Sequence, residues 1–423
     1  LPMVLRRAFK VAAEPPQGPV FLSMPIDVLD QEADMHIVPT TYVDCRSRPS
    51  EDTVRRAAEM LLGAQNPLIV VGDGVAVSGA QDEVAQLAEA TGARIMSAFA
   101  SEMNVRTDHP LYAGMLLVIS GEAMRAQLEG VDLLFAIGTP VFTQLFPTAG
   151  MLLPEGMRLM QLDLDSWEIA KNFPVDLGMQ ADPREGLRAI ITAVQARRSS
   201  EVGAVAQERA AQLAAVREQM DLMAREALER QWNQTPISVA RLMKQLADVV
   251  PEGTIVFDES ITSSGALQRY FTFTEPGSLF RARGGGLGPG MPGTIGVKLA
   301  RPDRPVVGVV GDGAALYTIQ SLWSAAHHKV NVTWVICNNQ SYRILKINML
   351  QYLGEAGRGR QFVAMDLTDP GINFAHVAES FGVRGWRVED PDELEPALRS
   401  AIALDGPALV DVVIDGSLGP LLG

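Results

Sequence analysis

Short apolar segments and longer segments with helical spacing alternate along most of the chain. The apolar segments have the length and composition of buried strands, and they lie at residues 67–71, 93–97, 131–137, 157–164, 254–257, 305–310, 332–337 and 408–414. The segments with apolar residues three or four positions apart are typical of helices, and they lie at residues 80–91, 120–128, 184–197, 236–249, 319–326, 373–381 and 392–404. Because strands that alternate with helices form βαβ units, we predict an α/β fold with two doubly wound parallel sheets, each covered by helices on both faces.

The segments outside these units predict how the two sheets are connected. Residues 1–13 have helical spacing, and residues 20–24 are apolar in the manner of a buried strand. One helix and one strand cannot form a core, so this region looks like the end of a further α/β domain. We expect the Ser50 hydroxyl to cap a helix that begins with two acids. Residues 197–230 are rich in Ala, Glu, Gln and Arg and predict a solvent-facing helix, because no apolar heptad is sustained that would favour a coiled coil.

Composition and charge exclude several classes of protein. The 423 residues include 36 Lys and Arg against 50 Asp and Glu, a formal net charge of −14. Such an acidic chain is a poor candidate for binding nucleic acid or an anionic membrane surface. No apolar run is long enough for a spanning helix. Cys45 and Cys337 are too few for a disulfide scaffold or a cysteine-based zinc site, and we expect two buried free thiols in a reducing cytoplasm.

The strongest chemical signal lies at the ends of two apolar segments. Gly311-Asp312-Gly313-Ala314 follows one of them, and Asn338-Asn339-Gln-Ser341 follows the next. The spacing between Asp312 and Asn339 fits one helical crossover, so the two strands can be neighbours with both ends at one edge of the sheet. A carboxylate, an amide oxygen and a backbone carbonyl form a set of ligands that suits Mg²⁺ bound to phosphate. The surrounding glycines allow a phosphate to approach the backbone, and a helix beginning near residue 318 would offer amide donors.

A second copy of the pattern tests how specific it is. Gly72-Asp73-Gly74 also follows an apolar segment, but no asparagine pair lies one crossover further along the chain. We therefore interpret Asp73 as a turn and capping residue. The Asp312 group, which does have the asparagine pair, is interpreted as a metal and phosphate site.

Two further segments carry glycines or hydroxyls. The run at 284–293 contains a literal G-x-G-x-x-G, with Asp312 at the distance of a ribose-binding acid, so binding of NAD is an alternative. Pro289 and Pro292 count against it, because proline lacks the amide that a pyrophosphate would use. The segment at 258–264 follows another strand and is rich in hydroxyls, which predicts either a phosphate-binding turn or a helix cap.

The glycine-rich run, the Gly-Asp-Gly group and the asparagine pair together resemble those of thiamine-diphosphate-dependent enzymes. The resemblance is to the superfamily of 2-oxo acid decarboxylases and acetolactate synthases, in particular the benzoylformate decarboxylase-like branch, and it covers essentially the whole chain. It implies the end of a pyrimidine-binding domain at residues 1–43 and a Rossmann-like central domain at 44–196, which includes Gly138-Thr-Pro-Val-Phe142. A helical linker follows at 197–229, and a diphosphate-binding domain follows at 230–423.

The resemblance also assigns expected roles to individual residues. Asp312 and Asn339 would ligate Mg²⁺ together with the backbone carbonyl of Ser341. The residues expected around the diphosphate are Thr262, Ser263, Gly311, Gly313 and Ala314. Leu287 would wedge under the cofactor and force its bent shape, and Gly285, followed by Gly286, would offer a backbone carbonyl to the 4′-amino group. The activating glutamate is expected in the pyrimidine-binding domain before the residues present here, so no catalytic residue is assigned.

The implied activity is non-oxidative decarboxylation of a small 2-oxo acid through a C2 carbanion, with thiamine diphosphate and Mg²⁺ as cofactors. Alternatives are acetolactate synthase-type carboligation or a non-catalytic cofactor-binding relative. FAD is not expected, because Gly72-Asp73-Gly74 is too weak a sign of a flavin site.

Benzoylformate decarboxylases carry a histidine just after the central Pro-Val-Phe, where this chain reads Thr143-Gln-Leu-Phe146. Arg281 and Arg283 would bind a second anionic group of the substrate or pair with acids of the protein. A cytoplasmic homodimer or homotetramer is implied.

Overall fold

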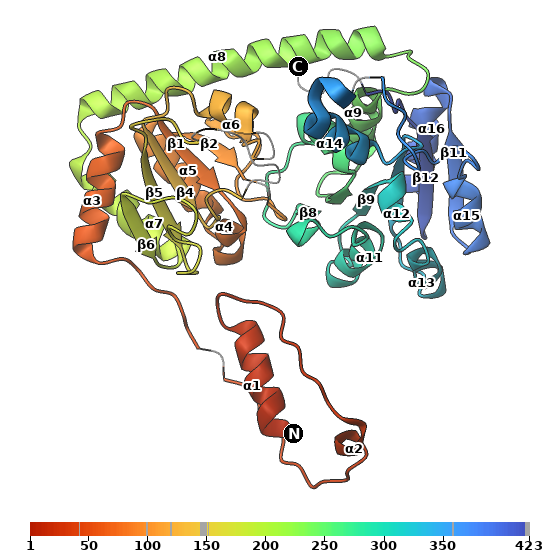
Figure 1. Ribbon diagram of the computed structural model, residues 1–423, viewed down its shortest axis with the longest axis horizontal. Helices are drawn as coiled ribbons and strands as arrows, with labels where there is room; N and C mark the ends of the chain where they lie inside the picture. The colour runs from red at the N-terminus through yellow and green to blue at the C-terminus, as the bar shows by residue number, and fades with distance from the viewer. Residues whose placement is uncertain are drawn as a thin grey trace. The chain divides into compact units, whose positions relative to one another are not determined.

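The computed structural model describes residues 1–41, 43–98, 100–118, 121–143, 150, 152–357 and 359–418. The chain divides into two compact units, Leu1–Ala98 with Ala113–Ala210, and Phe99–Tyr112 with Ala211–Gly423. Each unit contains one six-stranded sheet, and most of the elements are labelled in Figure 1. Within the described ranges, no helix is both long enough and apolar enough to cross a membrane.

The sheet of the first unit has the strand order β3-β2-β1-β4-β5-β6. Its strands are β1 (Pro67–Val71), β2 (Arg94–Ser97), β3 (Tyr112–Met115), β4 (Leu133–Ile137), β5 (Arg158–Asp163) and β6 (Leu177–Gln180). The pairs β1–β2, β1–β4, β4–β5 and β5–β6 are parallel. The central strands β1 and β4 are buried along their whole length, as expected for a parallel sheet with helices on both faces.

Helices cover this sheet in two layers. They are α3 (Glu51–Leu62), α4 (Asp73–Ser78), α5 (Gln81–Thr91), α6 (Gly121–Leu128) and α7 (Pro183–Arg197). Met124 and Leu128 of α6 pack with Leu68, Val70 and Leu134 on one face, whereas α3, α4 and α5 pack around α7. The Ser50 hydroxyl accepts the Thr53 amide at 3.3 Å, so the predicted N-cap of α3 is confirmed.

The sheet of the second unit has the order β11-β12-β10-β9-β7-β8, and all five strand pairs are parallel. Its strands are β7 (Ile255–Glu259), β8 (Leu279–Arg281), β9 (Val306–Gly311), β10 (Thr333–Asn338), β11 (Arg384–Val388) and β12 (Ala408–Val413). Its helices are α9 (Val239–Val249), α10 (Ser264–Tyr270), α11 (Gly290–Ala300), α12 (Asp312–Ala315), α13 (Ser321–His327), α14 (Arg343–Leu353), α15 (Phe374–Ser380) and α16 (Leu394–Ile402). Short 3₁₀ turns occur at Ile261–Ser263, Arg283–Gly285, Gly354–Gly357 and Pro391–Glu393.

Alternate residues of the strands build a separate core on each face of this sheet. Val335 and Cys337 of β10 join the core that contains α9, α10 and α16, whereas Trp334 and Ile336 join the core that contains α11, α13 and α15. This alternation follows from the two-residue period of a strand. The predicted α/β fold with two doubly wound parallel sheets is thereby confirmed.

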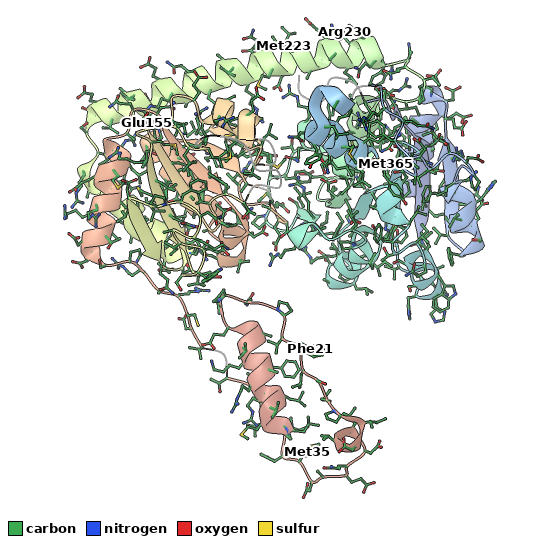
Figure 2. The ribbon with its side chains drawn as sticks, viewed as in Figure 1. Phe21, Met35, Glu155, Met223, Arg230 and Met365 are labelled. Atoms are coloured by element: carbon green, nitrogen blue, oxygen red, sulfur yellow. The ribbon has the colours of Figure 1, made fainter. Side chains whose placement is uncertain are left out.

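Helix α8 (Ser200–Gln231) is 32 residues long and confirms the helix predicted at 197–230. In Figure 2 the side chains of Met223 and Arg230 project from it, and Met223 is 57% exposed. In the first unit, Arg209 of this helix donates to the carbonyls of Ala64 and Thr91. In the second unit, Arg217 donates to the carbonyl of Thr107 at 3.0 Å.

The N-terminal segment confirms one prediction and overturns another. Helix α1 (Pro2–Ala13) forms as its spacing predicts, and a short helix α2 (Ile26–Leu29) follows. The buried strand predicted at 20–24 is wrong, because these residues have no regular structure and Phe21, labelled in Figure 2, is 91% exposed. A strand requires a neighbour for its amides and carbonyls, and no strand of the described chain pairs with this segment.

Candidate functional site

The two motif-bearing strands are neighbours, as predicted. β9 and β10 are parallel, with Gly311 opposite Cys337, so Asp312 and Asn338 emerge at the same edge of the sheet. The helix expected near residue 318 is α13, which begins at Ser321, and a further short helix, α12, begins at Asp312 itself. The chain turns into α12 within one residue because Gly311 adopts an extended N-cap conformation.

The carboxylate of Asp312 is held by backbone amides. It accepts the amide of Gly313 at 2.8 Å and that of Ser341 at 3.4 Å, and Asp312 is only 2% exposed. Burial raises the pKa of Asp312 to about 6, although the amide hydrogen bonds act in the opposite direction. A buried carboxylate of this kind gains from a cation that compensates its charge.

The two asparagines have different surroundings. The amide nitrogen of Asn338 donates to Asp411 at 2.8 Å, and its side-chain oxygen accepts the Gln340 amide at 3.3 Å. The side-chain oxygen of Asn339 is buried and has no hydrogen-bond partner among the residues that the structure describes. An unpartnered buried acceptor costs free energy, so of the two asparagines Asn339 is the one whose side chain would gain from binding a ligand.

The loop that carries Asn339 is held in one conformation by its backbone, by a hydrogen bond and by close packing. Gln340 has a positive φ of 55°, which turns the chain so that the following amide meets Asp312. The Ser341 hydroxyl donates to the carbonyl of Met365 at 3.0 Å, which anchors the loop; Met365 is labelled in Figure 2. A Cβ at Gly416 would lie 2.5 Å from the Asn339 carbonyl oxygen, so only glycine fits there.

The hydroxyl side chains of the turn at 258–264 fall into two sets with different surroundings. The buried Asp258 carboxylate accepts the hydroxyls of Ser260 and Ser264, both within hydrogen-bond distance at 2.6 and 2.5 Å. These two hydroxyls therefore serve the turn itself, which includes a strained φ of 51° at Ile261. Thr262 is half-buried and Ser263 is buried, in the 3₁₀ turn that directly follows β7 and Ser260.

The glycine-rich run is held by a residue that the sequence analysis overlooked. The buried Glu259 at the end of β7 accepts the amide of Gly288 at 2.7 Å and that of Gly290 at 2.6 Å. These amides are the donors that the NAD alternative would use for a pyrophosphate, and they are already engaged. Leu287, immediately before them, is 43% exposed. Glu259 ends β7 and the glycine-rich run follows the neighbouring strand β8, so the available signal for Glu259 was a carboxylate at a strand end beside a G-x-G sequence.

The backbone before Leu287 requires glycine. Gly284 and Gly285 have φ of 73° and 74°, in the left-handed region. A Cβ at Gly285 or Gly286 would meet nothing within 4 Å, so these residues lie open on one side. At Gly313 a Cβ would lie 2.8 Å from the Tyr342 ring. The predicted residues at 285–287 follow β8, and those at 311–314 lie at the end of β9. Both strands pair with β7, which connects the two segments.

Both arginines beside the glycine-rich run have partners in the protein. Arg281 Nε lies 3.2 Å from the Asp258 carboxylate; the Asp258 side chain is fully buried and that of Arg281 is 10% exposed. Arg283 lies 3.6 Å from Glu102 and donates to the Ser101 hydroxyl at 3.1 Å. These contacts favour pairing with acids over binding of a second anionic substrate group.

Three other sequence predictions can be placed. Asp73 lies in the first turn of α4, and the neighbouring strand β4 continues into Gly138 rather than into an asparagine pair. Cys337 is a buried free thiol whose pKa burial raises, whereas Cys45 is half-buried, so the expectation of two buried thiols is wrong for Cys45. Of the segment Thr143-Gln-Leu-Phe146, only Thr143 belongs to the described residues.

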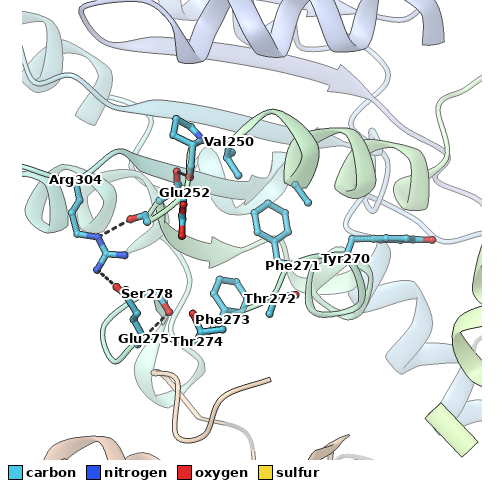
Figure 3. Close-up of a pocket in the computed structure, with 14 residues that line it drawn as sticks. Val250, Glu252, Tyr270, Phe271, Thr272, Phe273, Thr274, Glu275, Ser278 and Arg304 are labelled. Atoms are coloured by element: carbon cyan, nitrogen blue, oxygen red, sulfur yellow. Dashed lines mark hydrogen bonds and ion pairs between the residues drawn. The ribbon is translucent and has the colours of Figure 1, made fainter. Parts of the chain in front are cut away.

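A cavity of about 310 Å³ lies at the opposite edge of the second sheet. Figure 3 shows Val250, Phe271, Phe273 and Arg304 among its lining residues. They belong to the segments that lead into β7, β8 and β9, which places the cavity at the amino ends of the strands. In open parallel sheets ligands bind at the carboxyl ends, so this cavity is separate from the Asp312 site.

The residues at the carboxyl edge fit Mg²⁺ and a diphosphate. The described residues contain no group of three or more His, Cys, Asp or Glu side chains that could hold a metal. Mg²⁺ does not need such a group, because it is held by one or two carboxylates together with phosphate oxygens and water. A buried carboxylate at Asp312 and an unpartnered amide oxygen at Asn339 supply the protein's share of that set.

The fold and these strand ends define the class of open α/β proteins, in which ligands bind outside the carboxyl ends of the strands. Comparison with known proteins gives the family. The thiamine pyrophosphate enzyme central domain matches residues 54–190, and the C-terminal TPP binding domain of the same enzymes matches residues 261–412. The chain belongs to the thiamine pyrophosphate enzyme family, as the resemblance of the glycine-rich run and the Gly-Asp-Gly and Asn-Asn groups predicts.

Individual relatives include both decarboxylases and synthases. Benzoylformate decarboxylase of Pseudomonas aeruginosa is 30% identical over 97% of this chain and 73% of its own length. A probable acetolactate synthase large subunit of Methanocaldococcus jannaschii is 27% identical over 98% of this chain and 70% of its own. Among solved structures, the thiamine diphosphate-dependent 4-hydroxybenzoylformate decarboxylase of Rhodococcus jostii RHA1 matches with a TM-score of 0.82 and 28% identity, covering 98% of this chain and 74% of that one.

Proposed function

We propose that this chain binds thiamine diphosphate with Mg²⁺ and catalyses the non-oxidative decarboxylation of a 2-oxo acid. The observation that carries the proposal is the buried, unpartnered side-chain oxygen of Asn339, in a loop whose Ser341 amide binds Asp312. In a family defined by thiamine pyrophosphate, a metal-bridged diphosphate accounts for this arrangement. When bound, thiamine diphosphate supplies the electron sink for the pair released as CO₂ leaves.

The proposed roles follow the two halves of the cofactor. Asp312, Asn339 and the Ser341 carbonyl would hold Mg²⁺. Thr262 and Ser263 would donate hydroxyls to the diphosphate, and the backbone at 311–314 would lie beside it. The glycine-rich run would accept the organic half, where Leu287 offers an exposed apolar side chain and the open backbone of 285–286 offers its carbonyls.

The reaction type is proposed from the relatives. The first relative decarboxylates benzoylformate by its name, which makes an aromatic 2-oxo acid the first substrate to test. The acetolactate synthase relatives favour carboligation as the second candidate. The cytoplasmic location and the homodimeric or homotetrameric state implied by the resemblance remain predictions, as do the domain boundaries at 43, 196 and 229.

Calorimetry and product analysis test these proposals together. Thiamine diphosphate should bind in the presence of Mg²⁺ and should bind far more weakly when EDTA removes the metal. Release of CO₂ and benzaldehyde from benzoylformate would support decarboxylation, whereas formation of acetolactate from two molecules of pyruvate, with release of one CO₂, would support the synthase alternative. Metal-dependent binding without turnover of any 2-oxo acid tested would support a non-catalytic relative, and absence of binding would refute the proposal.

A further inference from the structure

The carboxylate of Glu259 connects two segments that are far apart in sequence. Each of its oxygens accepts one amide of the glycine-rich run, from Gly288 at 2.7 Å and from Gly290 at 2.6 Å. The residue is 2% exposed, so the carboxylate is withdrawn from water and depends on these donors. The Gly288 amide follows Leu287 directly and Gly290 is the first residue of α11, so the carboxylate fixes the point where the run turns into α11.

The fit around this carboxylate is close. A Cβ at Gly290 would lie 2.5 Å from Glu259 Oε2, so glycine is needed for the contact. The Gly288 carbonyl accepts the Thr318 hydroxyl at 2.5 Å, and its φ of 109° is one that side chains rarely adopt. Gly288 is thus held through both its amide and its carbonyl, which restricts the Leu287 backbone immediately before it.

Glu259 is equally fixed with respect to the metal half of the candidate site. It lies opposite Val310 in the pairing of β7 with β9, and its carbonyl oxygen is 3.7 Å from the position of a Cβ on Gly311. Asp312 follows Gly311, and the turn with Thr262 and Ser263 follows Ser260. One residue therefore fixes the distance between the strand ends that would hold the diphosphate and the run that would hold the organic half.

We propose that Glu259 is a positioning residue that sets Leu287 at the correct distance from the metal and diphosphate ligands, through the amides of Gly288 and Gly290. The inference rests on the proposed function. It assigns Glu259 no contact with the cofactor. Its removal should therefore impair binding of the whole cofactor while leaving binding of an isolated diphosphate intact.

The test compares two probes on the full chain, thiamine diphosphate and inorganic pyrophosphate, each with Mg²⁺. In Glu259→Gln the side-chain NH₂ group replaces one of the two acceptor oxygens and faces a backbone N–H that it cannot accept. The glycine-rich run should therefore lose one of its two contacts, and thiamine diphosphate should bind at least about tenfold more weakly. Pyrophosphate should bind within about twofold of the wild type, because Asp312, Asn339, Thr262 and Ser263 are unchanged. Hydrogen exchange of peptides covering 284–292 should accelerate in the variant.

Two further variants keep the test decisive. Glu83→Gln, at a buried carboxylate of the first unit that pairs with Arg184 and Arg188, is the matched control and should change neither affinity. If Glu259→Gln does not fold, Gly290→Ala disturbs the same contact from its other side. If Glu259 acts through Leu287, the loss in Glu259→Gln should not add to the loss in Leu287→Ala.

The outcomes separate this inference from the proposed function. If the wild type binds neither probe with Mg²⁺, the proposed function fails and the inference fails with it. If the wild type binds both, and the Glu259 variant loses both equally or keeps both, only the assignment of Glu259 is overturned. A selective loss of thiamine diphosphate with faster exchange at 284–292 supports it.

Discussion

The side-chain nitrogen of Asn338 donates to the carboxylate of Asp411 at 2.8 Å, inside the second unit. Asp411 is fully buried and also accepts the Phe374 amide and pairs with Arg387 at 2.8 Å. Burial raises the pKa of Asp411, and its hydrogen-bond donors oppose that shift. The first asparagine of the pair is therefore part of the scaffold, which leaves the second free for a ligand.

Asp411→Asn should lower the free energy of unfolding by about 3 kcal/mol, because it leaves Arg387 without its buried partner. Urea denaturation followed by circular dichroism measures this change. Arg387 has a second, exposed partner, Glu389, at 2.7 Å, and Glu389→Gln should cost less than about 1 kcal/mol. Equal losses in the two variants would contradict the scaffold role of Asp411.

Asp312→Asn and Asn339→Ala should each weaken Mg²⁺-dependent binding of thiamine diphosphate by at least about tenfold, because each removes a proposed metal ligand. Isothermal titration calorimetry with and without EDTA measures the loss. The chain supplies its own control in Asp73→Asn, which changes the same residue type in the same Gly-Asp-Gly sequence. Retention of metal-dependent affinity in Asp312→Asn would remove Asp312 from the site.

Two glycines of α11 should respond in opposite directions to substitution by alanine. A Cβ at Gly293 would lie 2.5 Å from the buried Phe257 ring, so Gly293→Ala should destabilise the protein by about 1–3 kcal/mol. A Cβ at Gly296 would meet nothing within 4 Å, so Gly296→Ala should stabilise it by about 0.5–1 kcal/mol. Thermal or urea unfolding of the two variants is the measurement, and a gain at Gly293 would contradict the packing argument.

Asp163 at the end of β5 should make stability depend on pH. Burial raises its pKa from 3.8 to about 6, so the folded state disfavours the ionised form. The stability penalty is absent below about pH 4, grows as the pH rises to about 6 and is constant above that. Asp163→Asn removes the charge and keeps an oxygen for the Asp165 amide, which the native carboxylate accepts at 2.9 Å.

The variant should therefore be more stable than the wild type at pH 7, by at most about 3 kcal/mol for a shift of this size. The difference should shrink towards zero near pH 4. Urea unfolding at pH 4, 5, 6 and 7 measures it. A difference that does not change with pH would show that Asp163 ionises normally in the folded protein.

The sequence predicted those elements whose own pattern of apolar and polar residues is enough to identify them. The largely apolar strands β1, β4, β9, β10 and β12 are buried on both faces, and a short, mostly apolar run of this kind is typical of a strand inside a parallel sheet. Strands β3, β6, β8 and β11 were missed because they are the edge strands of the two sheets and are short or polar. Helix α11 was missed because its five-residue start, Gly-Met-Pro-Gly-Thr, has the composition of a turn.

The sequence by itself determined the α/β class, the alternation that makes the sheets parallel, and the spacing that brings Asp312 and the asparagine pair to one edge. The tertiary structure decided which asparagine is free, because Asp411 arrives from β12, far along the chain. It also decided that Glu259 holds the glycine-rich run and that Arg281 pairs with Asp258. Periodicity and spacing record what each segment can form locally, whereas hydrogen-bond partners between distant segments depend on how the strands pair.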